Sequence, residues 1–402
     1  MVPDGKPSCP PRPGGLTLAR SFYFLYYAAL ASLSPFLVLH YQHLGLSGRQ
    51  IGVLTGIPPA LFLVGASAWG SLADATRQHR LVLVAAIAGA MASSLLLARG
   101  ETFLALIPVV AAFALFGAPI VPLVDHAVLE LLGRERDRYG RVRLWGALGW
   151  GAAGPVVGWL TQEYGLRWSF TGYLVAMLGC LCVGLTLPVS QARLEGPFRH
   201  GLRQLLANRQ WLLFLFLAFA GGMGMASVHH YLFLYLEGLG ASRSLMGLAL
   251  TCAMVSELAV FRFSDRLLRR FDLRWLLILC MAITAGRLFA YSVATAPWQA
   301  LLLQLLHGPT FAVMWVAGVS SANRFAPPGL GATAQGLFSG VNFGLGGAAG
   351  ALAGGALYQA VGAAGMFRWA AVWVLAATLA YALATRGATT APPESPAEGG
   401  RP

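Results

Sequence analysis

The chain has 402 residues, of which 57% are hydrophobic and only 11% charged, and its mean hydropathy is +0.65. These values exclude an ordinary soluble globular domain and indicate that lipid is the main solvent of the chain. The formal charge of +13 would suggest nucleic acid in a soluble protein. Here the basic residues gather in short polar connections, so no nucleic-acid partner is expected.

Residues 1–15 are rich in Pro and Gly and lack a cleavable signal peptide, so we expect a cytoplasmic tail there. Twelve apolar stretches follow, each long enough to cross the ~30 Å hydrocarbon layer as a helix. They lie near residues 18–40, 51–73, 81–98, 103–132, 142–161, 168–187, 211–236, 245–263, 275–293, 298–323, 332–358 and 365–384. The sequence therefore predicts an all-α membrane protein with twelve transmembrane helices.

The longest polar connection, residues 189–209, divides these helices six and six and is expected to be a cytoplasmic linker. We predict an N-terminal six-helix bundle over 16–188 and a C-terminal six-helix bundle over 210–386. Residues 387–402 lack the apolar content to fold, which predicts a disordered cytoplasmic tail.

The two predicted halves share three short internal repeats at similar offsets. Leu44-Gly45-x-Ser47 recurs as Leu239-Gly240-x-Ser242, the string GAAGPVVG at 151–158 recurs as GAAGALAG at 347–354, and Asp74 matches Asp265. An even number of helices separates the copies, so the halves share one orientation and are related by an axis along the membrane normal. A central cavity between two pseudo-symmetric bundles is expected.

The distribution of Lys and Arg predicts the orientation in the membrane. Most of the 28 basic residues face the cytoplasm if both termini do. We therefore expect a multi-pass protein of the bacterial inner membrane with both termini in the cytoplasm.

The stretch from Gly70 to Arg80 reads GSLADATRQHR and resembles the GxLaDrxGrrr signature of the major facilitator superfamily, with Arg77 in place of the second glycine. The resemblance extends over essentially the whole chain. Within the superfamily the chain is most similar to the branch of 3-phenylpropionate permeases, related to lactose permease and other oligosaccharide and nucleoside proton symporters. The residues that carry this similarity are RSFYFLYYAALASLSPF, DRYGRVRLWGALGW, Glu257 with Phe261, and LLHGPTFAVMW.

Ionisable residues inside membrane helices cost a few kcal/mol each and are functional candidates by default. Glu257 and Arg287 each lie about thirteen residues into their helices, ~20 Å deep, and His307 lies within a turn of that depth. We expect the three side chains to converge near the midplane. The resemblance to lactose permease implies that Glu257 carries the proton, Arg287 tunes it, and His307 is a relay or a substrate ligand. The alternative is a permanent Glu257–Arg287 pair that only fixes packing.

In the first half, Asp125 is the other deep acid and a further candidate for proton coupling. Arg143 and Trp145 approach it from the same side of the membrane, so we predict an intracellular gate there; the alternative is that Arg143 snorkels to the interface. Asp74 is expected to pair with Arg80 or to cap a helix, unless it is simply a solvated charge. The predicted gating residues are Gly70, Asp74, Arg80, Arg143, Trp145 and Asp265.

Other polar and aromatic residues are candidates for substrate binding, although each is equally compatible with an interhelical contact. Together with Arg287 and His307, the candidates are Tyr26, Tyr27, His230, Trp315 and Asn342, with His229 and Tyr231 as further possibilities. Two rows of glycines, at Gly336, Gly340 and Gly344 and at Gly346, Gly350 and Gly354, predict close contact between the two halves.

The expected function is proton-coupled uptake of a small organic solute by alternating access. An aromatic or small organic acid is preferred as substrate, because a guanidinium can hold a carboxylate bidentately; a sugar or nucleoside comes next. Gly154-Pro155-x-x-Gly158 partly resembles a motif of proton antiporters, so export by antiport is an alternative, and a non-transporting receptor is another.

Chemistry of other kinds is not expected. The sequence contains no HExxH, GxSxG or Cys/His metal pattern, so we predict neither an enzyme nor a cofactor nor a metal site. The cysteines behave as small apolar residues in this interpretation. The predicted partners are the solute, protons and the lipid bilayer, and the predicted oligomeric state is a monomer.

Overall fold

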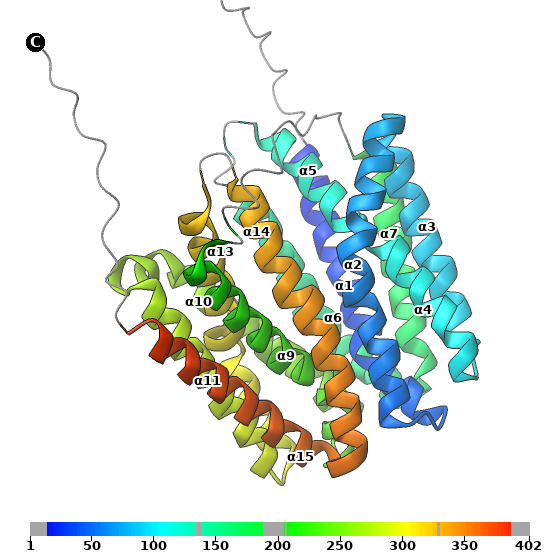
Figure 1. Ribbon diagram of the computed structural model, residues 1–402. Coiled ribbons are helices and arrows are strands. Elements are labelled where there is room, and N and C mark those ends of the chain that lie inside the picture. The colour runs from blue at the N-terminus through cyan, green and yellow to red at the C-terminus, as the bar shows by residue number, and fades with distance from the viewer. Residues whose placement is uncertain are drawn as a thin grey trace, which may run out of the picture.

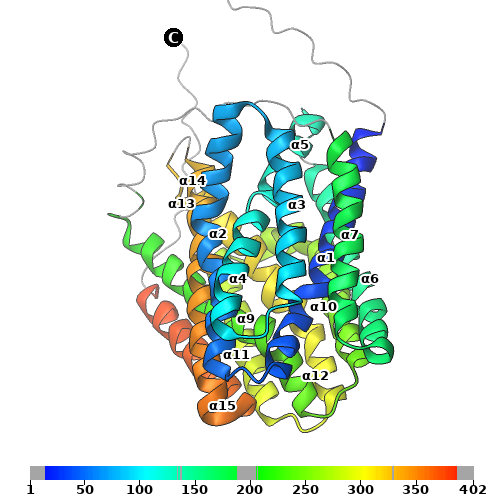
Figure 2. The same ribbon diagram turned by 90° about the vertical axis from the view of Figure 1, so that its right-hand side faces the viewer.

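The computed structural model describes residues 14–133, 135, 138–187, 205, 207–327 and 330–386. These residues are almost entirely helical, and none of them lies in a strand. The helices form two bundles that lie side by side (Figure 1). Figure 2 views the molecule from the side of the N-terminal bundle. The predicted linker and both tails fall largely or wholly outside the described residues.

The described part of the N-terminal bundle contains seven α-helices. They are α1 (Gly15–His43), α2 (Gly48–Thr76), α3 (His79–Leu97), α4 (Phe103–Gly117), α5 (Ile120–Leu132), α6 (Tyr139–Tyr164) and α7 (Arg167–Thr186). The segments α4 and α5 follow one another across Pro119 and together form one crossing.

The C-terminal bundle contains more interruptions. Its segments are α9 (Arg209–Gly238), α10 (Arg243–Arg270), α11 (Leu273–Val293), α12 (Pro297–Leu303), η2 (Gln304–Leu306), η3 (Gly308–Ala312), α13 (Val313–Phe325), α14 (Gly331–Ser339), η4 (Gly340–Gly346) and α15 (Gly347–Ala384). The segments η3 and η4 are π-helical turns within otherwise α-helical crossings.

The lengths of these helices account for twelve crossings of a membrane. Nine helices of the described part are both long and apolar enough to span a bilayer, and the last of them, Thr333–Ala384, is long enough for two crossings. Gly362 divides it, because its backbone leaves the helical region there, at φ 73° and ψ 178°. The remaining two crossings are α2 and α6, with 29 and 26 residues. The fold is that of an all-α membrane protein with two six-helix bundles.

The repeated LG-x-S motif is a helix end followed by a helix start. Gly45 and Gly240 have φ of 76° and 79°, a left-handed conformation that glycine adopts without steric cost. Two residues later Ser47 accepts a hydrogen bond from the amide of Gln50, and Ser242 accepts one from Leu245. Each serine thereby satisfies one of the free amides at the start of α2 or α10. The repeat in the sequence is thus a repeat of local structure.

The two halves meet most closely at the end where α1 finishes and α2 begins, which we call the closed end. There α6 packs on α10, and α2 packs on α15. A Cβ atom on Gly158 would lie 2.6 Å from the Arg243 carbonyl, and one on Gly48 would lie 2.8 Å from the Gly355 carbonyl. Only glycines permit such an approach of two backbones. The ribbons of the two halves spread apart toward the opposite end (Figure 1).

The prediction that the glycine rows join the halves is wrong for the second row and stays a prediction for the first. Gly346, Gly350 and Gly354 face α9 of the same half, with Phe219, Met223 and Tyr231 among their neighbours. Contact with the other half is made instead by Gly355, one residue further along the helix. A spacing of four places residues on one face, but it does not say which neighbour that face meets.

Candidate functional site

Arg287 is a deeply buried cation with neutral neighbours. It is 1% exposed and lies on α11. Its guanidinium donates hydrogen bonds to Thr310 Oγ1 at 3.0 Å, to the Tyr291 hydroxyl at 3.3 Å and to Gln304 Oε1, and it lies over the Tyr291 ring. In the described part of the chain no carboxylate pairs with it, and its Nε has no acceptor. The site therefore holds a positive charge without a counter-ion.

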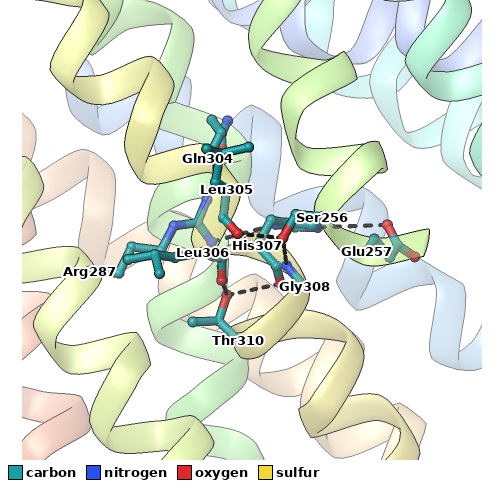
Figure 3. Close-up of polar contacts among 9 residues, drawn as sticks. All are labelled: Ser256, Glu257, Arg287, Gln304, Leu305, Leu306, His307, Gly308 and Thr310. Carbon is teal, nitrogen blue, oxygen red and sulfur yellow. Dashed lines mark hydrogen bonds and ion pairs between the residues drawn. The ribbon is translucent and has the colours of Figure 1, made fainter. Parts of the chain in front are cut away.

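His307 lies between Arg287 and Glu257 (Figure 3). Its Nδ1 is 3.5 Å from Arg287 Nη1, and its Nε2 is 4.0 Å from Glu257 Oε2. A guanidinium only donates hydrogen bonds, so Nδ1 is the ring nitrogen placed to accept from Arg287, and Nε2 is the one that faces Glu257. The three predicted residues do come together. The alternative of a direct Glu257–Arg287 pair is wrong, since the imidazole separates the two charges.

An interrupted helix positions His307. The chain passes from α12 through η2 to His307 and then into η3, which begins with Gly308 and Pro309. Ser256 on α10 holds this junction, since its hydroxyl donates to the Leu305 carbonyl and accepts from the Gly308 amide at 3.0 Å. Irregular backbone at membrane depth is tolerated where such groups satisfy its free polar atoms. The break thus turns the imidazole toward α10 and α11.

A second cluster lies in the N-terminal half. The hydroxyl of Tyr23 on α1 donates a hydrogen bond to Asp125 on α5. The Arg143 guanidinium of α6 lies over the rings of Tyr23 and Tyr27, 5.3 Å and 4.8 Å from their centroids, in cation–π geometry. Asp125 and Arg143 are close enough to interact electrostatically, but no direct ion pair joins them among the described residues. The gate predicted between them stays a prediction.

Arg143 also connects the two clusters. Its charge acts on Glu257 of the other half, across the contact between α6 and α10. One guanidinium is therefore within electrostatic reach of an acid in each half. The role of Arg287 as the cation that tunes Glu257 stays a prediction.

The predicted substrate residues divide into two groups. Tyr26 and Tyr27 contact each other on α1 beside Arg143, and His230 lies on α9 next to His229. Trp315 and Asn342 line a cavity inside the C-terminal half, and Trp315 packs on Phe343. Tyr231, in contrast, is structural, since its hydroxyl donates to the Ala351 carbonyl at 2.6 Å.

Several of the predicted gating residues lie at the surface of the protein. Gly70 has open space where a Cβ would lie, and Arg80, Trp145 and Asp265 are exposed. The Asp74 side chain lies outside the described part of the structure, so its pairing with Arg80 stays a prediction.

Sequence reasoning missed several residues of the site. These are Tyr23, Ser256, Tyr291, Gln304 and Thr310, together with Trp150, which stacks on His229 of the other half at 6.2 Å. Gln304 could have been predicted from the sequence, because a lone amide in an apolar helix needs a hydrogen-bonding partner. Tyr23 could have been predicted as well, because it precedes Tyr27 by four residues and so shares its face of the helix.

Two six-helix bundles that enclose buried ionisable side chains are typical of the major facilitator fold. A solved structure of the nucleoside transporter NupG has the same fold, with a TM-score of 0.80 at 17% identity, over 93% of this chain and 100% of that one.

The profile of the MFS_1 like family matches residues 16–369, and the chain belongs to this family of major facilitator transporters. A maltose permease of Geobacillus stearothermophilus is 30% identical over 81% of this chain and 83% of its own. A probable 3-phenylpropionic acid transporter of Escherichia coli (strain K12) is 26% identical over 74% of this chain and 79% of its own. The protein is a multi-pass membrane transporter and not an enzyme.

Proposed function

We propose that this transporter takes up a small organic acid together with protons. The observation that carries the proposal is Arg287, a buried guanidinium whose partners are all neutral. An unpaired charge at this depth is costly, and an anion that reaches it replaces weak neutral contacts with a charge-assisted pair. A sugar or nucleoside would bring no charge to the site, so an acid is preferred although one relative is named a maltose permease.

Proton coupling is assigned to Glu257. This acid is partly accessible, with 19% of its side chain exposed, and it lies next to the imidazole of His307 and within reach of Arg143. Burial favours the protonated carboxyl, whereas a nearby guanidinium favours the ionised one. Movement of α6 relative to α10 changes the distance from Arg143 to Glu257. The protonation of Glu257 therefore depends on the conformation of the transporter.

The transport cycle follows from the orientation in the membrane. With both termini in the cytoplasm of a bacterial inner membrane, as the distribution of basic residues favours, the closed end faces outward. The structure then represents an inward-facing state, in which the outer contacts between α2 and α15 and between α6 and α10 are made. Alternating access requires these contacts to break while the opposite ends approach.

Transport in proteoliposomes tests the proposal. An inward proton gradient should drive accumulation of a labelled small carboxylate such as 3-phenylpropanoate. Glu257→Gln should abolish accumulation against a gradient but retain exchange, and Arg287→Met should abolish both. Arg262→Met is the matched control, since this exposed arginine of α10 lies over the ring of Phe263.

The alternatives give different results in the same vesicles. Export by antiport is favoured if an outward gradient of the acid drives protons inward rather than outward. A sugar or nucleoside transporter is favoured if only these solutes exchange and Arg287→Met has no effect. A receptor on a transporter scaffold would show no solute flux, which contradicts the proposal.

A further inference from the structure

One side of α10 turns away from the rest of the protein along most of the helix. Leu248, Val255 and Phe263 lie on this side and are 40%, 55% and 52% exposed. Their positions fall within about 80° of one another around the helix axis, since each residue advances by about 100°. Exposed apolar side chains in a row on a membrane helix contact lipid. We call this side the lipid face of α10.

The lipid face ends in arginines at the end of the molecule opposite the closed end. Arg266 and Arg270 fall within the same sector of the helix, about one and two turns beyond Phe263, and both are exposed. The Arg266 guanidinium lies over the Phe263 ring, 5.6 Å from its centroid, in cation–π geometry. An apolar face thus leads directly into a pair of positive charges where the helix leaves the membrane.

The acids nearby do not neutralise these two charges. Asp265 lies one residue before Arg266 and therefore points to a side of the helix about 100° away. Asp272 caps α11 instead, since its side chain accepts a hydrogen bond from the Arg274 amide at 2.8 Å. Among the residues that the structure describes, no carboxylate pairs with Arg266 or Arg270, and neither guanidinium donates a hydrogen bond. Both side chains therefore keep their donors available for an anion.

The matching segment of the first half lacks these arginines. The alignment that pairs Asp265 with Asp74 places Leu72, Ala75 and His79 at the positions of Phe263, Arg266 and Arg270. Leu72 is 46% exposed, much like Phe263, but the first of the two arginines is replaced by an alanine and the second by a histidine that is only 7% exposed. The repeated fold therefore does not require two arginines on this face. Their presence in one half only indicates a function particular to that half.

We propose that Arg266 and Arg270 bind the headgroup of an anionic phospholipid, such as phosphatidylglycerol, in the leaflet around this end of the molecule. A guanidinium matches the geometry of a phosphate and can donate two hydrogen bonds to it. The Phe263 ring and the lipid face then contact the acyl chains of the same molecule. A soluble phosphate compound would gain nothing from this apolar surface, so a membrane lipid fits the site better. The inference is independent of the transported solute.

Native mass spectrometry of the purified full-length protein in detergent tests the inference. The probes are phosphatidylglycerol and phosphatidylcholine with identical acyl chains. We expect phosphatidylglycerol to bind more tightly, and Arg266→Gln with Arg270→Gln to weaken its binding about twentyfold, since each arginine near an anionic lipid contributes about fivefold. Binding of phosphatidylcholine should change much less. Arg99→Gln with Arg167→Gln is the matched control, because it removes two exposed arginines at the closed end.

Phe263→Ala provides a second readout. It keeps both charges but removes the ring under Arg266, so we expect about threefold weaker binding of phosphatidylglycerol. Val255→Ala should have no such effect, because Val255 lies two turns further from the arginines on the same face.

Three results would overturn the inference. The first is equal affinity for the two lipids, or equal weakening in the arginine pair and its control. The second is displacement of phosphatidylglycerol by millimolar glycerol 3-phosphate, which would show that the arginines bind a soluble phosphate. The third is a dimer that dissociates in Arg266→Gln with Arg270→Gln, which would assign this surface to a second copy of the chain.

Discussion

Gln162 and Arg243 join the two halves at the closed end through a hydrogen bond of 2.9 Å, in which the Arg243 amide donates to Gln162 Oε1. Arg243 is the first residue of α10, so the glutamine of one half satisfies a free amide at the start of a helix in the other. A second bond repeats this arrangement, with the Arg49 amide of α2 donating to Gln359 Oε1 at 3.1 Å. Equivalent glutamines, one from each half, thus help to fasten the closed end.

Removing both glutamines should favour opening of the closed end. Each bond contributes about 1 kcal/mol, so Gln162→Ala with Gln359→Ala should raise the ratio of open to closed molecules about tenfold or more. Electron–electron distance measurements between spin labels at positions 164 and 298 would detect the change. Gln299→Ala is the matched control, because Gln299 accepts from the Thr295 amide within one half. An unchanged distance distribution in the double variant would show that the glutamines do not fasten the halves.

A large residue at Gly355 should prevent closure. A Cβ atom there would lie 2.7 Å from the Gly52 Cα and 2.8 Å from the Tyr231 hydroxyl, so Gly355→Leu cannot be accommodated while α2 and α15 remain in contact. We expect the same pair of labels to report an open end and net transport to stop. Gly336→Leu is the control, since a Cβ at Gly336 has open space. Normal transport by Gly355→Leu would contradict this account of the contact.

Arg77 adopts a conformation that suits glycine. It ends α2 with φ 55°, in the left-handed region, at the position where the superfamily signature has its second glycine. An L-residue with a side chain pays about 1–2 kcal/mol there. Arg77→Gly should therefore raise the melting temperature, whereas Arg77→Ala, which removes the same charge but keeps a Cβ, should not. Equal melting temperatures for the two variants would assign any effect to the charge.

Ser256 should matter for the stability of the interrupted helix. Its hydroxyl serves both the Leu305 carbonyl and the Gly308 amide, which belong to another crossing. Ser256→Ala leaves these groups without partners, and we expect a loss of about 1–3 kcal/mol in stability. Ser264→Ala, which removes a hydroxyl bonded only to Phe261 of its own helix, should change the melting temperature much less. A similar loss in both variants would show that the junction does not depend on Ser256.

The number and order of the crossings were predictable from apolar length alone, because a bilayer imposes that length on every spanning helix. The interruptions within the helices were less predictable. A break after Leu303 is compatible with Gly308 and Pro309, but nothing in the local pattern of residues 340–346 marks a π turn. Such turns depend on packing between crossings, which a pattern along one helix does not contain.

The candidate site was likewise predictable only in part. Depth along the helices brought Glu257, Arg287 and His307 together correctly, since rise per residue is fixed. Depth says nothing about rotation around each helix axis, and it was rotation that placed His307 between the two charges and turned Arg287 toward Gln304 and Thr310. The reach of Arg143 to Glu257 depends on contact between the halves, which no single segment predicts.

The glycine contacts at the closed end involve main-chain atoms, whereas the cavity and the charged clusters are built from side chains. The contacts that close the molecule therefore lie in other residues than Glu257, Arg287 and His307, whose side chains come together inside the C-terminal half. We expect a substitution in this polar cluster to leave the geometry of the closed end intact.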